Sequence, residues 1–371
     1  MSTVQGLRAG IIAGVLIGMT LAAGTVSAQG NFSTERPSSI LIFPKVVNTS
    51  DTIIQITNTS NMMTFAHCFY TDGRSVGGVP VWQVTDFEIA LTRQQPTHWA
   101  ASTGRPVNPQ DSIGGIDPGL IPPVSPGFTG FLVCVETLLD GTPAGGNSLK
   151  GEATVGEING VGGTNNVAKY NAIGIPACNG AQGLCGPSGG DVDGDNVLSL
   201  DGIEYAKCPG GVYVNFTAEG APDLAIEGAG NTPSAVSTNL TLVPCGMDFQ
   251  NLRPVTSRLS IPIIENEFEN RVSIEPGRDL TCWFSGTLVT PGVFGPPFVM
   301  SLTGLGSEFG TALIRPQSTT VPPWLGVATV LRTAGDGTSD TAATNLHFCV
   351  DQTAPASCVP FSSEIRLPDV P

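Results

Sequence analysis

Basic residues are scarce in this sequence. Lys and Arg number 16 against 31 Asp and Glu in 371 residues, which gives a formal net charge of −15. Nucleic-acid binding depends on clusters of Lys and Arg that neutralise phosphates, and such clusters are absent, so we expect no nucleic-acid partner. Charged residues of both signs make up 13% of the chain, about half of the ~25% usual in soluble domains. The acidic balance is compatible with cation binding and equally with solubility alone.

Histidine and paired metal-binding motifs are scarce as well. The three His are His67, His98 and His347, and none belongs to a His-Glu-x-x-His motif. No Cys-x-x-Cys spacing occurs, which argues against zinc. Gly186-Pro187-Ser188-Gly189-Gly190 matches the Gly-x-Ser-x-Gly pattern of hydrolases, but it lacks the preceding strand and the following helix of a nucleophile elbow. The sequence therefore assigns no catalytic residue.

Only one long hydrophobic run is present, from Ala9 to Ala23. It follows Arg8 and precedes Val26-Ser27-Ala28, a small-x-small cleavage pattern. Because a membrane span needs ~20 apolar residues, we predict a cleaved signal peptide over residues 1–28 rather than an uncleaved anchor. The remaining 343 residues contain no second such run. We therefore expect an exported protein with no membrane span after signal cleavage, located in the periplasm, at the cell surface or outside the cell.

Helical patterns are missing too, since no amphipathic helix longer than two turns stands out. Short runs of β-branched and aromatic residues end instead at turn residues, as where Thr52–Thr57 meets Asn58-Thr59-Ser60. The 47 Gly and 30 Pro suit many turns between short strands. These patterns predict an all-β fold. Pro44 and Pro262 each interrupt an opening strand, which favours an edge position for both strands.

The nine Cys include two matching signatures. Ala66-His67-Cys68-Phe69-Tyr70 is followed by Phe131-Leu132-Val133-Cys134-Val135, and Leu280-Thr281-Cys282-Trp283-Phe284 is followed by Leu346-His347-Phe348-Cys349-Val350. The two Cys are 66 residues apart in the first signature and 67 in the second. Cysteines in an oxidising compartment are mostly paired. The repeat therefore predicts the disulfides Cys68–Cys134 and Cys282–Cys349, each of which clamps one β-sandwich unit.

Five further Cys remain. Proximity predicts the pairs Cys178–Cys185 and Cys208–Cys245, which leaves Cys358 free or in an intermolecular bond. Cys349–Cys358 is a competing local pair, and spacing alone does not decide the connectivity.

The strand openings of both halves resemble immunoglobulin-like modules of bacterial surface proteins. The first half carries Ile53–Ser60, a strand that ends in Asn-Thr-Ser, and Leu259–Ile264 repeats the opening strand in the second half. The resemblance implies two tandem immunoglobulin-like β-sandwich domains and an exported location, but no chemistry. Domain 1 is expected over residues 38–252, with a Gly/Cys/Asp-rich insertion at about 141–210, and domain 2 over residues 255–371.

Asp191-Val192-Asp193-Gly194-Asp195-Asn196 is the strongest chemical motif. Three carboxylates at alternate positions around Gly are how a calcium loop gathers hard oxygen ligands. The motif resembles the start of EF-hand and dockerin loops, although the sixth position is Asn196 and the twelfth is Gly202. The resemblance implies a Ca²⁺ site at Asp191, Asp193, Asp195 and Asp201. An acidic, solvated turn is the alternative.

The residues after this motif favour a hairpin over an EF-hand helix. Val197–Leu200 and Ile203–Ala206 alternate in polarity around Asp201-Gly202, a favoured type I′ turn. A second acidic group, Glu265–Asn270, is interpreted as a solvated turn, with a bridging Ca²⁺ as the alternative. Among the four Trp, Trp283 is expected to pack on the Cys282 disulfide and Trp324 to be exposed.

Two functional hypotheses follow. The first is an exported, non-catalytic β-sandwich protein with a structural, adhesive or binding role, stabilised by Ca²⁺, whose partners are other surface proteins, glycans or a second copy of itself. The second is a secreted hydrolase or a glycan-binding module that uses the insertion. It requires carboxylates, His98 and an exposed Trp to converge on one pocket.

Overall fold

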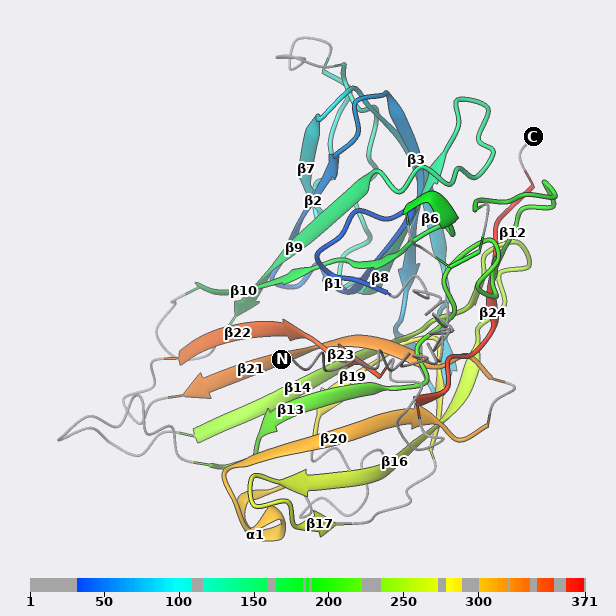
Figure 1. Ribbon diagram of the computed structural model, residues 1–371. Helices are drawn as coiled ribbons and strands as arrows, with labels where there is room; N and C mark the ends of the chain where they lie inside the picture. The colour runs from blue at the N-terminus through cyan, green and yellow to red at the C-terminus, as the bar shows by residue number, and fades with distance from the viewer. Residues whose placement is uncertain are drawn as a thin grey trace, which may run out of the picture.

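The computed structural model describes residues 32–108, 116–158, 165–182, 185–186, 189–221, 235–272, 278–288, 300–318, 321–333, 339–349 and 358–369. These residues form 24 strands, one 3-10 helix (Gly180–Gln182) and one short α-helix, α1 (Leu302–Leu305) (Figure 1). The predicted all-β fold is confirmed. The predicted signal peptide lies outside the described residues.

Two antiparallel sheets come from the first half of the chain. The five-stranded sheet has the order β11-β1-β8-β3-β6, and the four-stranded sheet has the order β10-β9-β2-β7. Their strands are β1 (Ile40–Val47), β2 (Thr52–Asn58), β3 (Thr64–Asp72), β6 (Val84–Leu91), β7 (Pro96–Ala100), β8 (Thr129–Thr137), β9 (Leu149–Ile158), β10 (Asn165–Asn171) and β11 (Ile173–Ile175). A small hairpin, β4 (Ser75–Val76) and β5 (Val79–Pro80), projects from them. Along β2 the buried and exposed side chains alternate, as expected for a half-buried strand.

Three further sheets complete the described part of the chain. Their orders are β12-β24-β15, β17-β16-β20-β13-β23 with β18 also paired to β16, and β19-β14-β21-β22. Their strands are β12 (Val197–Leu200), β13 (Val212–Thr217), β14 (Ala235–Pro244), β15 (Met247–Asp248), β16 (Thr256–Asn266), β17 (Arg271–Val272), β18 (Arg278–Thr281), β19 (Phe284–Thr287), β20 (Phe309–Pro316), β21 (Trp324–Thr333), β22 (Ser339–Asn345), β23 (His347–Phe348) and β24 (Ser363–Arg366).

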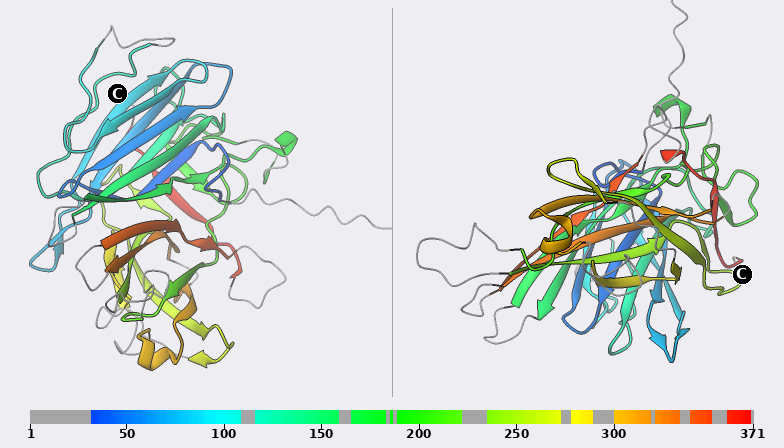
Figure 2. Two further views of the ribbon diagram at one scale, coloured as in Figure 1. Left: turned by 90° about the vertical axis from the view of Figure 1, so that its left-hand side faces the viewer. Right: turned by 90° about the horizontal axis from the view of Figure 1, so that it is seen from below.

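The predicted pair of tandem immunoglobulin-like sandwiches is wrong. The five larger sheets are arranged as a five-bladed β-propeller, and the strands of the first half lie directly against those of the second (Figure 2). Neighbouring sheets share their cores, and β21 contributes to three core clusters. Its Val327 packs with the first half of the chain, Leu325 with both halves, and Trp324 with the second half. Tandem modules would keep separate cores, so the sequence repeat does not mark independent units.

The predicted boundary between residues 252 and 255 does not separate the sheets. β13 and β14 fall inside the predicted domain 1, yet β13 pairs with β20 and β23, and β14 pairs with β19 and β21. β12, from the predicted insertion, pairs with β24. Local strand patterns identify a strand but carry no information on such distant partners, which explains the error.

The predicted edge positions of the two Pro-containing strands are also wrong. β1 lies between β11 and β8, and β16 lies between β20 and the short strands β17 and β18. The pairing register shifts between Phe43 and Val46 in β1, and between Ser260 and Ile263 in β16. A β-bulge therefore accommodates each Pro, and the ladder on the other side of the strand does not extend to Pro44 or Pro262.

The bulge in β1 is a contact point between the two halves. The carbonyl of Pro44 accepts a hydrogen bond of 2.8 Å from Nε1 of Trp283. Nζ of the buried Lys45 donates to Oγ1 of Thr329 on β21 at 3.3 Å. The Tyr170 hydroxyl accepts from the backbone N–H of Lys45 and donates to its carbonyl. Side chains thus satisfy backbone groups that the bulge removes from the ladder.

The edge strands β10 and β22 lie beside each other without a backbone ladder (Figure 1). The amide of Asn345 bonds both backbone groups of Asn171, accepting from its N–H at 3.2 Å and donating to its carbonyl at 2.7 Å. The Asn166 side chain donates to the carbonyl and the hydroxyl of Ser339. Amide side chains therefore join two sheet edges that would otherwise be open.

Four disulfides are present, and three of them confirm predicted pairs: Cys68–Cys134, Cys178–Cys185 and Cys208–Cys245. Cys68 and Cys134 are facing residues of β3 and β8 in one sheet, whereas an immunoglobulin disulfide joins two sheets. The predicted Cys282–Cys349 bond is wrong, because Cys349 pairs with Cys358. Cys282 is a buried free thiol. Trp283 consequently packs beside Gly73 rather than on a disulfide.

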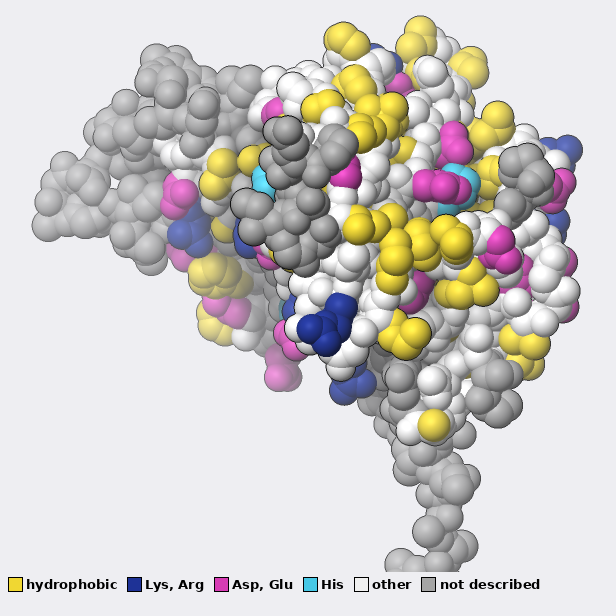
Figure 3. Space-filling model, turned by 90° about the horizontal axis from the view of Figure 1, so that it is seen from above, with side chains coloured by type: hydrophobic (Ala, Val, Ile, Leu, Met, Phe, Trp, Pro, Cys, Tyr) yellow, Lys and Arg dark blue, Asp and Glu magenta, His cyan; other side chains and the backbone are white. Residues whose placement is uncertain are grey.

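The exposed surface of the described chain is mixed in character. Seen from above, hydrophobic side chains form several small groups with acidic side chains between them (Figure 3). No helix in the described ranges has the length and apolar character required to span a bilayer.

Candidate metal site

Three carboxylates of the predicted calcium motif lie together in the loop that precedes β12. Asp191, Asp193 and Asp195 each place one oxygen within 4.8 Å of the others. Asp191 is half-buried, whereas Asp193 and Asp195 are exposed. This is the one group of three or more His, Cys, Asp or Glu with such spacing among the described residues.

The Asp191 carboxylate fixes the shape of this loop. Its Oδ1 accepts hydrogen bonds from the backbone N–H groups of Gly194 (2.9 Å) and Asp195 (3.2 Å), and its Oδ2 accepts from Asn196 (2.9 Å). Gly194 and Asn196 have φ values of 73° and 59°, a left-handed conformation that Gly and Asn tolerate best. The local sequence therefore dictates a tight turn that directs the following carboxylates to one side.

Glu204 adds a buried carboxylate to this region. It is 8% exposed, and its Oε2 accepts from the backbone N–H of Ser199 at 2.9 Å. Burial raises the pKa of Glu204, backbone hydrogen bonds from Ser199 and Val192 oppose that shift, and the charge of Asp193 raises the pKa further. Glu204 lies two places after Gly202, the twelfth position of the motif. It was assigned from the sequence to a hairpin arm and not to the ligand set.

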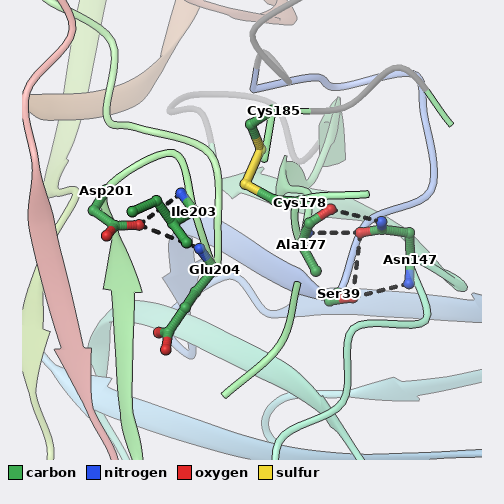
Figure 4. The surroundings of a disulfide bond; sticks show 8 residues. All are labelled: Ser39, Asn147, Ala177, Cys178, Cys185, Asp201, Ile203 and Glu204. Carbon is green, nitrogen blue, oxygen red and sulfur yellow. Dashed lines mark hydrogen bonds between the residues drawn. A yellow bond between two sulfur atoms is a disulfide. The ribbon is translucent and has the colours of Figure 1, made fainter. Parts of the chain in front are cut away.

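Asp201 is not part of the three-carboxylate group, although the sequence predicted it as a ligand. Its Oδ1 accepts from the backbone N–H groups of Ile203 (2.7 Å) and Glu204 (3.2 Å), which closes the turn after β12 (Figure 4). Gly202 has a φ of 83°. The chain turns at Asp201-Gly202, but the predicted type I′ hairpin is wrong. Asp201 lacks the positive φ that this turn type requires, residues 203–206 form no strand, and β12 pairs with β24 instead.

The segment before the loop is anchored on the first sheet. The side chain of Asn147 bonds both backbone groups of Ala177, at 2.8 and 2.9 Å, and its own backbone N–H donates to the Ser39 hydroxyl (Figure 4). The Cys178–Cys185 disulfide follows immediately. On the far side of the loop, the backbone N–H of Leu367 donates to the carbonyl of Asn196. The loop is therefore held from both ends.

A cavity of about 510 Å³ lies on the β12-β24-β15 sheet, and Asp191, Asp193 and Asp195 do not line it. Asp201, Asp248, Glu364 and Arg366 contribute its charged lining. Arg366 bonds Glu364 through Nη2 at 2.7 Å, and this bond raises the pKa of Arg366, with smaller contributions from Glu364, Asp248 and Asp195 charges. Because Arg366 is the one cation of the lining, the charge of this region is negative overall.

The second acidic group forms a turn, as interpreted from the sequence. Its central residue, Asn266, is buried and accepts from the backbone N–H groups of Phe268 and Asn270. Glu265 pairs with Arg271, and Oε1 of Glu267 accepts from the Ser307 hydroxyl. These carboxylates are therefore engaged by neighbouring side chains.

The three His are spread over different strands. His67 on β3 lies 3.0 Å from the exposed Asp86 carboxylate on β6, while His98 and His347 lie on β7 and β23 and are exposed. Ser188 of the Gly-x-Ser-x-Gly pattern lies outside the described residues. Among the described residues, the three His therefore do not come together with one another or with the predicted calcium loop at one site.

The tryptophans do not support the predicted exposed platform. Trp82, Trp99 and Trp324 are buried, with 6%, 2% and 0% of their surface exposed, so the predicted exposure of Trp324 is wrong. Trp283 is partly buried and bonded to Pro44. The convergence of His98 and an exposed Trp that a hydrolase or glycan site on the insertion requires is not observed.

No protein-family model matches this chain, and no curated protein is similar to it.

Proposed function

We propose that the protein is an exported, non-catalytic protein with a structural, adhesive or binding role at the cell surface or outside the cell. We also propose that Ca²⁺ at the Asp191–Asp195 loop stabilises it. Four disulfides support export, since such bonds persist in oxidising compartments.

The observation that carries the calcium proposal is the placement of three carboxylate oxygens within 4.8 Å of one another. Like charges at this separation repel, and a divalent cation with oxygen ligands relieves that repulsion. Arg366, which the charge of Asp195 influences, is bonded to Glu364 instead. Asp191 is oriented by three backbone N–H groups, so the turn that presents the carboxylates does not need to form on binding.

A cation bound here would stabilise the connection between the two halves. The loop leads directly into β12, which pairs with β24, and Asn196 bonds Leu367 beyond that strand. Because Ca²⁺ would bind the folded loop and not the unfolded chain, stabilisation grows as RT ln(1 + [Ca²⁺]/Kd), about 2.7 kcal/mol at a hundred times Kd.

The test is a thermal melt of the mature chain in excess Ca²⁺ and in chelator, with the disulfides intact. We expect a higher Tm in Ca²⁺, no comparable effect of Na⁺, and loss of the difference in the double variant Asp193→Asn/Asp195→Asn. Asp201→Asn is the matched control, because Asp201 lies outside the three-carboxylate group and should retain the response. Equal Tm values in Ca²⁺ and chelator would make the loop a solvated acidic turn.

A further inference from the structure

Two exposed aromatic side chains occupy one corner of the molecule. Phe268 and Phe309 are 68% and 52% exposed, and they are the two aromatic residues among the large exposed hydrophobic side chains of the described chain. Phe268 lies in the turn after β16, and Phe309 begins β20. The backbone N–H of Glu267 donates to the carbonyl of Phe309 at 3.3 Å, so the two segments are in contact. Exposed apolar groups on neighbouring segments are a starting point for a search for a ligand-binding surface.

A cavity of about 430 Å³ lies at this corner. Phe309 lines it together with polar residues of the paired strands β13 and β20, namely Asn215, Thr217 and Thr311, and with Glu267. The residues that line it include one carboxylate and no Lys or Arg. Phe216 and Val330 also line it, so the cavity combines the exposed Phe309 ring and other apolar groups with hydroxyl, amide and carboxylate groups.

These polar groups are already oriented. The Thr311 hydroxyl donates to Oδ1 of Asn215 at 2.8 Å, which turns the Asn215 NH₂ group away as a donor. Oε1 of Glu267 accepts from the Ser307 hydroxyl at 2.5 Å. The buried Asn266 fixes the turn from beneath, because its Nδ2 donates to the carbonyl of Leu305 at the end of α1. Little ordering is then required when a ligand binds.

The chemistry of the cavity selects among ligand classes. The lining contains no Lys or Arg to pair with an anionic ligand. The cavity is open and combines apolar with polar groups, whereas a lipid chain is best accommodated in an enclosed and uniformly apolar cavity. The face of a sugar ring carries C–H groups that pack on an aromatic ring. Its edge carries hydroxyls that form hydrogen bonds with carboxylate and amide groups. We propose that this corner binds a neutral carbohydrate, with one sugar ring on Phe309 and its hydroxyls on Glu267 and Asn215.

This inference gives the proposed binding role a ligand class, and it uses residues that are separate from the calcium loop. The two proposals therefore fail independently. Loss of the Ca²⁺ effect on Tm would leave carbohydrate binding intact, and failure to bind carbohydrate would leave the Ca²⁺ effect intact.

The test is isothermal titration of the mature protein with maltohexaose, cellohexaose, mannohexaose and chitohexaose, first in Ca²⁺ and then in chelator. We expect at least one of them to bind, and Phe309→Ala to weaken that binding at least fivefold. Glu267→Gln should weaken it as well. Leu139→Ala is the control, because Leu139 is 82% exposed and does not line this cavity.

Phe309 is exposed, so its variant should melt within a few degrees of the parent chain and any loss of binding can be assigned to the corner. No binding by all four oligosaccharides would overturn the proposal. Equal binding by the parent chain and Phe309→Ala would also overturn it, because the sugar would then occupy another surface.

Discussion

Cys282 offers a direct test of the disulfide arrangement. Eight of the nine Cys are paired, and Cys282 is the one free thiol. It lies between β18 and β19 with a φ of 66° and 1% of its surface exposed. Its neighbours are the core residues shared by the two halves. The thiol should therefore be inert in the folded protein and reactive in the unfolded one.

The expected protection follows from the pKa. Burial raises the pKa of Cys282 from 9.0 to about 12. Because the thiolate is the reactive form, its fraction at pH 8 falls from about one in ten to about one in 10⁴, roughly a 10³-fold decrease in reaction rate. Steric exclusion from the core slows the reaction further, so labelling should follow the opening of the fold rather than the chemistry of the thiol.

The assay is titration of the free thiol with a chromogenic thiol-reactive reagent at pH 8, without reductant. It is run once in buffer and once in guanidinium chloride. We expect no reaction on the time scale of minutes in buffer and one thiol per chain in denaturant. Peptide mapping of the labelled chain should place the label on Cys282 and recover a Cys349–Cys358 peptide. Fast labelling in buffer, a label on Cys358, or a Cys282–Cys349 peptide would refute the arrangement.

Two further predictions concern buried polar groups. The buried Glu136 accepts from Ser39 and Ser148, and burial raises its pKa despite these bonds. The protonated form is therefore favoured on folding, and stability should decrease as pH rises from about 4.5 through the folded pKa. Glu136→Gln should remove that decrease in urea midpoints measured from pH 4 to 7.5, and parallel profiles would contradict the reasoning. Trp283→Phe removes the bond to the buried Pro44 carbonyl, and an unsatisfied buried acceptor costs about 1–3 kcal/mol. Urea denaturation should show at least that loss, and an unchanged midpoint would contradict it.

Local patterns in the sequence identified many strands but not their partners. The run at Thr52–Thr57 corresponds to β2, because alternation of apolar and polar residues is a local property. The pairing of β12 with β24 depends on residues far apart in the chain, and no local pattern encodes it. The repeat of Pro44 and Pro262 did carry structural information, although it specified bulges inside sheets rather than edges.

The candidate site shows the same limit. Asp191, Asp193 and Asp195 are close in sequence, so a motif could place them together, and the structure does so. Glu204 reaches the loop only because the turn at Asp201 reverses the chain after β12. The Phe309 corner combines residues from β13, β16 and β20. From the sequence, Glu267 and Phe268 were interpreted as part of a solvated turn, with a bridging Ca²⁺ as the alternative.

The three-stranded sheet forms late in synthesis, because a chain is made from its N-terminus and β24 lies near the end of the described residues. β12 is available early, but the residues that pair with it lie late in the chain, where Val197 meets Arg366. Until β24 emerges, β12 lacks its ladder partner, and its own core side chains, Leu198 and Leu200, lack their packing against Ile365. Long-range pairing of this kind is slow and leaves incomplete chains open to proteolysis and aggregation. A chain truncated before β24 would therefore be more open to proteolysis and aggregation than one that carries β24.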